Sequence, residues 1–205
     1  MVRKTKDEAQ KTRTDIMAAA ERLFYERGVV RTSLQEVATH AGVTRGAIYW
    51  HFQDKVALLR SIADRDFVPL ESLLDRLAEQ EWEDPLVPFC RECITSMNMI
   101  ANNPRIRRVF TILTQRCEYI DEMMGLMKRN LDCRNKAYER FLQIFEQAYK
   151  KGILSSAWSP QSAAIALQYM IVGMLHLEME EEHPSRRRDQ DRKLAIESFF
   201  KALSA

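Results

Sequence analysis

The segment Thr44–Lys55, with the sequence TRGAIYWHFQDK, carries the side chains best suited to chemistry on another molecule. An arginine at the position of Arg45 can donate two parallel hydrogen bonds to the O6 and N7 atoms of guanine. Tyr49 and His51 can donate to phosphate oxygens, and the charge of Lys55 suits a phosphate as well. These residue types therefore predict a surface that binds both the base edges and the backbone of DNA.

A first short helix is expected just before this segment, in Ser33–Val43 (SLQEVATHAGV). Its apolar residues recur at i, i+3, i+4 and i+7, which is the spacing of one helical face. Ser33 and Glu36 have the spacing of a capping box, which predicts that the helix starts there. Gly42 is suited to the left-handed turn that ends a helix.

A second short helix is expected after Thr44, which can act as its N-cap. Ile48 and Phe52, with the small Ala47, form the apolar face that would point inward. The remaining side chains would then point outward, although Trp50 is expected to be partly in the core. Gly46 would let the backbone approach a groove closely because it has no side chain. The residues predicted to contact DNA are Thr32, Ser33, Thr44, Arg45, Gly46, Ala47, Tyr49, Trp50, His51 and Lys55.

The stretch from Thr12 to Lys55 resembles the DNA-binding domain of the TetR family of bacterial transcriptional regulators. The runs RKTKDEAQKTR and AGVTRGAIYWHFQDK are especially similar to the AcrR-like branch, the local repressors of multidrug efflux pumps. The resemblance implies about nine helices. Three would form a helix-turn-helix DNA-binding domain at residues 1–53, and the others a ligand-binding and dimerisation domain at residues 54–205.

Composition independently favours an all-α protein. The 205 residues are 46 % hydrophobic with few glycines and prolines, and every periodic segment has the helical period. Residues 1–60 hold 11 Lys and Arg against 7 Asp and Glu, whereas the remainder is slightly acidic. This charge asymmetry is typical of an N-terminal DNA-binding domain joined to a second domain with another function.

Other functional classes find little support in the sequence. It contains no Gly-rich phosphate loop, no paired metal-ligand spacing among the four histidines and no convincing nucleophile with a base, so we expect no enzyme, metal site or cofactor. Met1–Arg13 lacks the apolar run of a signal peptide, and the apolar stretch Ala163–Leu175 is too short for a membrane span, so a cytoplasmic protein is expected. Cys90 and Cys93 have C-x-x-C spacing, so on a helix they would lie at i and i+3. Free cysteine is among the most buried residue types, which favours small core residues over a redox sensor.

The body of the chain is expected to bind an inducer. Its stripes are rich in methionine, which adapts to varied apolar ligands but is also ordinary core filling. A small hydrophobic, drug-like inducer is favoured, and Glu118 or Asp121 could favour a cationic one. The residues expected at this site are Phe67, Leu70, Leu74, Met97, Phe110, Leu113, Thr114, Met127, Asn130 and Arg134.

Three further features of the body lead to predictions. Pro69 lies inside the pattern of the fourth helix and predicts a kink or break near residues 65–69. Arg134 and Asn130 interrupt an apolar stripe, where they would bond to each other across the core or to a bound molecule. The acidic run Glu178–His183 and the following arginines would neutralise each other on a solvated surface.

The last two helices carry more apolar surface than one partner can cover, which suggests a symmetric four-helix interface in a homodimer. The residues expected there are Ile165, Tyr169, Val172, Ile196, Phe199, Phe200 and Leu203.

Together these features predict a homodimeric regulator, most simply a repressor, that binds a pseudo-palindromic double-stranded DNA operator and leaves it when an inducer binds. Two alternatives stay open at this point. One is a TetR-type regulator or activator of a metabolic or lipid pathway with a narrow ligand site, and the other is a DNA-binding protein that needs no ligand.

Overall fold

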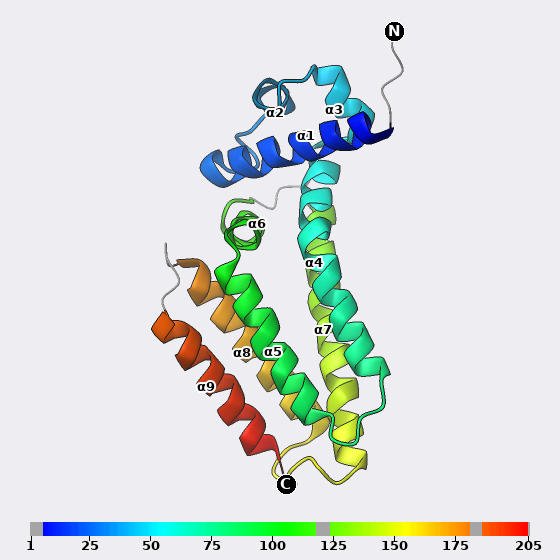
Figure 1. The fold of residues 1–205 in the computed structure, drawn as a ribbon, viewed down its shortest axis with the longest axis vertical. Coiled ribbons are helices and arrows are strands. Elements are labelled where there is room, and N and C mark those ends of the chain that lie inside the picture. Colours follow the sequence, from blue (N-terminus) through cyan, green and yellow to red (C-terminus); the bar gives the residue numbers. More distant parts are fainter. Residues whose placement is uncertain (1–5, 118–123, 181–185, 205) are drawn as a thin grey trace. The chain divides into compact units, whose positions relative to one another are not determined.

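The computed structural model describes residues 6–117, 124–180 and 186–204, without the side chains of residues 126, 127 and 186. This part of the chain forms nine α-helices and no strand beyond an isolated bridge between Leu154 and Ser204. The all-α class is therefore confirmed (Figure 1). The helices are α1 (Lys6–Arg27), α2 (Leu34–His40), α3 (Arg45–His51), α4 (Lys55–Glu79), α5 (Leu86–Asn102), α6 (Pro104–Gln115), α7 (Met124–Lys150), α8 (Pro160–Glu180) and α9 (Arg186–Leu203).

The predicted helix starts are confirmed by side-chain caps. Ser33 and Glu36 form the complete capping box of α2, in which the Ser33 hydroxyl accepts from the Glu36 amide and the Glu36 carboxylate accepts from the Ser33 amide. The Thr44 hydroxyl accepts from the Ala47 amide at the start of α3. Gly42, between these helices, has a φ of 66°, the left-handed conformation that glycine adopts without a steric penalty.

Helix α4 runs unbroken past Pro69, so the alternative of a helix break near residues 65–69 is wrong. A proline removes one backbone hydrogen bond from a helix, and the turns before and after Pro69 keep theirs, so the helix continues. A kink at this position stays a prediction.

Packing divides the chain into two compact units: residues 1–67 with 108–129, and residues 68–107 with 130–205. The bounds of these packing units differ from those of the predicted domains at residues 1–53 and 54–205. The predicted domains concern where DNA and ligand bind, and this division stays a prediction.

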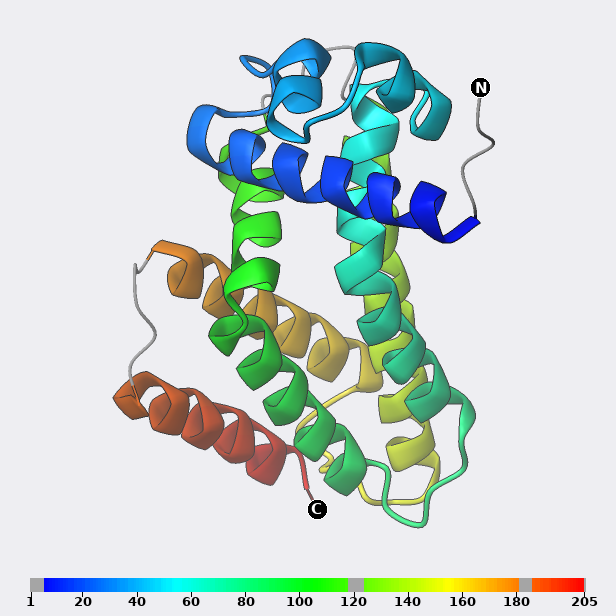
Figure 2. The same ribbon diagram turned by 45° about the horizontal axis from the view of Figure 1, so that its top comes forward.

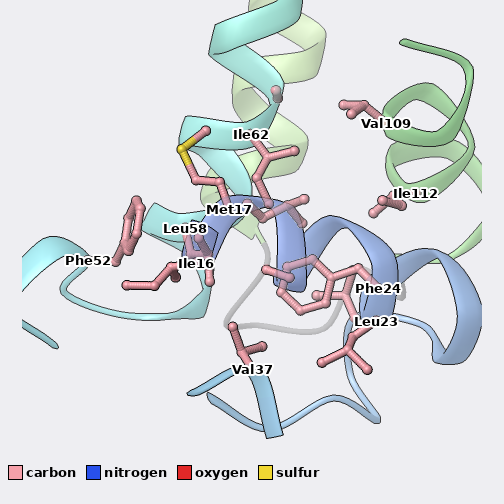
Figure 3. Packing of buried hydrophobic residues seen from close by; sticks show 14 of the residues in the cluster. Ile16, Met17, Leu23, Phe24, Val37, Phe52, Leu58, Ile62, Val109 and Ile112 are labelled. Carbon is pink, nitrogen blue, oxygen red and sulfur yellow. The ribbon is translucent and has the colours of Figure 1, made fainter. Parts of the chain in front are cut away.

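The first unit is built around α1, and Figure 2 shows α2 and α3 on the same side of that helix. Its core joins Phe24 of α1, Val37 of α2 and Ile48 of α3 to the start of α4. Val109 and Ile112 of α6 belong to the same core (Figure 3). These side chains are fully buried, so the position of the helix-turn-helix is set by contacts with α4 and α6 as well as with α1.

A buried charge cluster also ties α6 to α1 and α4 in this unit. The carboxylate of Glu21 accepts from Arg65 Nη2 at 2.7 Å and from Arg108 Nε at 3.0 Å. Arg65 also donates to Asp66 at 2.9 Å. Glu21 and Asp66 are almost fully buried, and a buried carboxylate without such partners would be strongly unfavourable.

The second unit has its own core, in which α5 packs against both α8 and α9. The ring of Phe89 on α5 lies 5.4 Å from those of Phe141 and Phe145 and 5.3 Å from that of Phe200, between ring centroids. Side chains of α7 also hold the C-terminal end of α4, since Gln143 and Gln147 both donate to the carbonyl oxygen of Ala78.

Part of the acidic run at the end of α8 is misassigned by the sequence interpretation. Glu178 is buried and pairs with Arg192 of α9, whose guanidinium also bonds to Asp189 and to the side-chain oxygen of Asn98 on α5. The Arg192 guanidinium therefore links α8, α9 and α5, and the carboxylate of Glu178 is a buried partner in that link and not a solvated surface charge. Residues 181–183 of the run lie outside the described residues.

Candidate nucleic-acid interface

The short helix α3 has one buried and one open face, as its sequence predicts. Ile48 is fully buried in the core of the first unit, whereas Tyr49 is 47 % and Trp50 73 % exposed. Arg45 is also exposed. Two exposed aromatic side chains thus lie beside an exposed arginine on the same short helix. The expectation that Trp50 is partly core is wrong, because the core beneath α3 is filled by Ile48 and Phe52.

Arg45 and Tyr49 form a pair on this open face. Arg45 Nη2 donates to the Tyr49 hydroxyl at 3.2 Å, and the guanidinium carbon lies 5.5 Å from the centroid of the tyrosine ring. The two residues are four positions apart on one helical face, where side chains meet. The contact orients the arginine but uses few of its five N–H donors, so the group can still bond to a base edge.

The other residues predicted on α3 lie where the motif places them. Gly46 is exposed, and a β-carbon there would meet little besides the Thr44 hydroxyl at 3.9 Å. Ala47 is half-buried. The His51 ring is also half-buried and packs edge-on against Trp50, with ring centroids 4.5 Å apart.

Lys55 and Thr32 are used inside the protein. Lys55 Nζ donates to the carbonyl oxygens of Val29, Val30 and Thr32 at 2.9, 3.3 and 3.0 Å. The Thr32 side chain is buried and donates to the Gly28 carbonyl at 2.8 Å. An ammonium has three donors, so in this structure the three carbonyls use all of those of Lys55. The DNA contacts predicted for Lys55 and Thr32 stay predictions, and each side chain would have to leave these carbonyls to bind a phosphate. The Ser33 side chain is exposed but already serves the capping box.

The predicted ligand residues are divided between the two packing units. Phe67, Phe110 and Leu113 belong to the first, where the rings of Phe67 and Phe110 meet edge-on at 6.4 Å. Thr114 is exposed there, and its hydroxyl donates to the Phe110 carbonyl. In the second unit Leu70, Leu74 and Asn130 are half-buried and Met97 is buried.

Arg134, also in the second unit, is exposed and not turned inward, so the inward position expected for it is wrong. The side chain of Met127 is outside the described residues, as are Glu118 and Asp121.

The predicted dimer residues separate into two groups. On α8, Tyr169 is 69 % exposed and Ile165 and Val172 are half-buried, so they offer surface to a partner. On α9, the side chains of three residues are buried within the subunit and offer none: Ile196, Phe200 and Leu203.

The prediction is therefore corrected for these three residues of α9. They belong to the core of the second unit, where the Phe200 ring meets that of Phe89 on α5, and the helical period of α9 does not tell an inner face from an outer one. Phe199 is half-buried against Trp158. The sequence interpretation missed Leu177 on α8 and Leu194 on α9, which are 57 % and 62 % exposed. In the sequence, the only sign of these exposed positions is that each is an apolar residue outside the main apolar stripe of its helix.

The two cysteines of the C-x-x-C pair are poor candidates for redox chemistry. Burial raises the pKa of the Cys93 thiol far above its usual range. Burial, followed by the negative charge of Glu197, also raises the pKa of Cys90. Both groups therefore stay protonated at neutral pH, and the protonated thiol reacts slowly with oxidants.

Comparison with known proteins agrees with this geometry. The family model for bacterial regulatory proteins of the tetR family matches residues 16–62, and that for the C-terminal region of MAATS-type transcriptional repressors matches residues 84–182. The HTH-type transcriptional repressor BepR of Brucella suis is 39 % identical over 175 residues, which cover 85 % of this chain and 84 % of BepR.

Two solved structures support the same assignment. One is the crystal structure of NalD, the secondary repressor of the MexAB-OprM multidrug efflux pump in Pseudomonas aeruginosa. It is 34 % identical with a TM-score of 0.85, over 97 % of this chain and 98 % of NalD. The SmeT–triclosan complex is 28 % identical with a TM-score of 0.81, over 96 % of this chain and 93 % of SmeT. The chain therefore belongs to the TetR family of bacterial regulatory proteins, the family of DNA-binding transcriptional regulators that its helix-turn-helix segment resembles.

Proposed function

We propose that this chain is a homodimeric repressor of a multidrug efflux operon, and that α3 of each subunit binds in the major groove of an operator half-site. The observation that carries the proposal is the open face of α3, on which Arg45, Tyr49 and Trp50 are exposed above a buried Ile48. BepR is a repressor by its description, and NalD represses an efflux pump. For two-fold symmetric operators of this kind, the two recognition helices must lie about 34–36 Å apart.

Helix α8 supports the dimer. By length and mean hydropathy it is apolar enough to cross a membrane, yet only 28 % of its 18-residue apolar window is buried within the subunit. An apolar helix that its own subunit covers so incompletely needs another cover, and a second copy of α8 is the one consistent with the family. The interface would include Ile165, Tyr169 and Val172, with Leu177 near its end. A dimer acting on chromosomal DNA would work in the cytoplasm.

The inducer would be a small hydrophobic molecule that binds the second domain. SmeT, a relative, has been solved in complex with triclosan, which supports a ligand of this class. An inducer that prefers a state with different spacing between the recognition helices lowers DNA affinity by linkage, typically by about 1–3 kcal/mol.

A mobility-shift assay tests the proposal. The purified protein is incubated with the duplex DNA upstream of its own gene and of any neighbouring efflux operon, and with a random duplex of equal length as control. We expect binding to an upstream duplex that exceeds binding to the random duplex by at least 100-fold, and release by triclosan or another apolar drug. Equal affinity for all duplexes would contradict a sequence-specific repressor, and specific binding that no drug weakens would contradict the inducer.

A further inference from the structure

Two arginines of the first unit lie over aromatic rings at opposite ends of α3. Arg45 is the first residue of α3 and stacks on Tyr49, as described above. Arg13 of α1 lies over Phe52, the C-cap residue of α3, with its guanidinium carbon 5.0 Å from the ring centroid. Both rings therefore hold a cation at a fixed position beside the helix proposed to bind DNA.

The charge of Arg13 is not neutralised by a carboxylate within the described residues. Arg13 Nη1 donates to the sulfur of Met17 at 3.2 Å, and a thioether is a weak acceptor. By contrast, Arg22 on the same helix pairs with Glu26, and Arg27 pairs with Glu36. Most of the five N–H donors of Arg13 thus remain available to another acceptor.

The cation that the sequence assigns to this role is occupied elsewhere. All three donors of Lys55 go to backbone carbonyls of the loop that precedes α2. The C-terminal end of a helix carries a partial negative charge, which favours a cation such as Arg13 beside Phe52. Of these two cations, Arg13 is therefore the one with N–H donors left for a phosphate.

We propose that Arg13 binds a DNA phosphate beside the C-terminal end of α3, a contact that completes the one made by Arg45 at the other end. A guanidinium matches phosphate with two parallel hydrogen bonds. The contacts with the Phe52 ring and with the Met17 sulfur hold the guanidinium in place in advance, so less side-chain freedom is lost on binding. The inference rests on the proposed role of α3 in DNA binding.

The test is the salt dependence of DNA binding for Arg13→Gln. Arg22→Gln is the matched control, because it removes the same charge from the same helix. The two positions are nine residues apart, which at about 3.6 residues per turn places them on opposite faces. Affinity for the upstream duplex that the wild-type protein binds best, and for a random duplex, is measured from about 50 to 300 mM salt by fluorescence anisotropy.

One lost phosphate contact per subunit lowers the slope of log K against log salt by about 0.9, or about 1.8 per dimer. At 0.1 M salt this corresponds to roughly eightfold weaker binding for each lost contact. We expect this loss for Arg13→Gln on both duplexes, because phosphate carries no sequence information, and no change for Arg22→Gln. Arg13→Lys keeps the charge but not the planar stack, so the slope should persist while affinity falls by a smaller factor.

Each other outcome overturns a defined claim. If Arg13→Gln keeps the wild-type slope while Arg45→Ala weakens binding, Arg13 does not contact phosphate but the proposed function stands. If Arg13→Gln fails to fold by circular dichroism, Arg13→Met decides, because it removes the charge but keeps an apolar side chain against Phe52, and a wild-type salt slope in that variant would refute the contact. If the wild-type protein does not prefer the upstream duplex, the proposed function itself fails.

Discussion

Replacing Lys55 with methionine should destabilise the first unit and leave the salt dependence of DNA binding unchanged. Methionine keeps an unbranched side chain of similar length but has no donor. The carbonyls of Val29, Val30 and Thr32 would then lose the ammonium that joins them across more than 20 positions of sequence. The amide of Val29 would still donate to the carbonyl of Arg116, which directly follows α6, at 2.9 Å, so the loop would keep this contact but lose the ammonium.

The magnitude follows from the three hydrogen bonds. A hydrogen bond from a charged donor contributes about 1.5–3 kcal/mol when its partner would otherwise be left unsatisfied. The Lys55 side chain is only partly buried, so water can replace some of what is lost. We therefore expect the free energy of unfolding to fall by about 3 kcal/mol in total, which is the upper value for one such bond or the lower value for two. For a chain of this length, that corresponds to a melting temperature roughly 6–12 °C lower.

Differential scanning calorimetry and the salt-dependent anisotropy assay measure the two quantities on the same protein. Lys11→Met is a suitable control, because Lys11 is exposed on α1 and its ammonium bonds to no carbonyl of the described residues. A Lys55→Met protein with wild-type stability and a salt slope reduced by about 0.9 per subunit would refute this reasoning. Lys55 would then leave the loop carbonyls when DNA binds.

Three further changes test the other main claims. Arg45→Ala should weaken operator binding by about 1–3 kcal/mol and relax selectivity at one base pair per half-site, and an equal loss on every DNA sequence would limit Arg45 to phosphate. Tyr169→Glu should convert dimers into monomers in sedimentation equilibrium, whereas Tyr149→Glu, equally exposed on α7, should not; dimers in both variants would remove α8 from the interface. Asp75→Asn should cost about 0.5–1 kcal/mol at pH 7 in urea unfolding, because hydrogen bonds from Lys136 and then Arg140 lower the pKa of Asp75. The deficit should shrink as the pH falls below about 4, where the unfolded-state carboxylate takes up its proton and the wild-type protein loses this contribution, and a deficit independent of pH would contradict the ion pairs.

Sequence alone determined the local structure and the family. The capping box at Ser33, the N-cap at Thr44 and the left-handed Gly42 are each decided by residues a few positions apart, so the pattern was sufficient to predict them. The same holds for the inward Ile48 and the outward Arg45 of α3.

Tertiary structure decided which polar groups remain free and which apolar faces remain open. Lys55 and Thr32 look like DNA contacts in the sequence, but their donors meet carbonyls that the fold brings close. Ile196 and Phe200 look like an interface because a helical period identifies an apolar face without naming the element that covers it, and α5 covers theirs. The stack of Arg13 on Phe52 joins residues 39 positions apart and has no signature in sequence spacing. Contacts of this range depend on how the helices pack, and packing is the property that a pattern read along the chain does not contain.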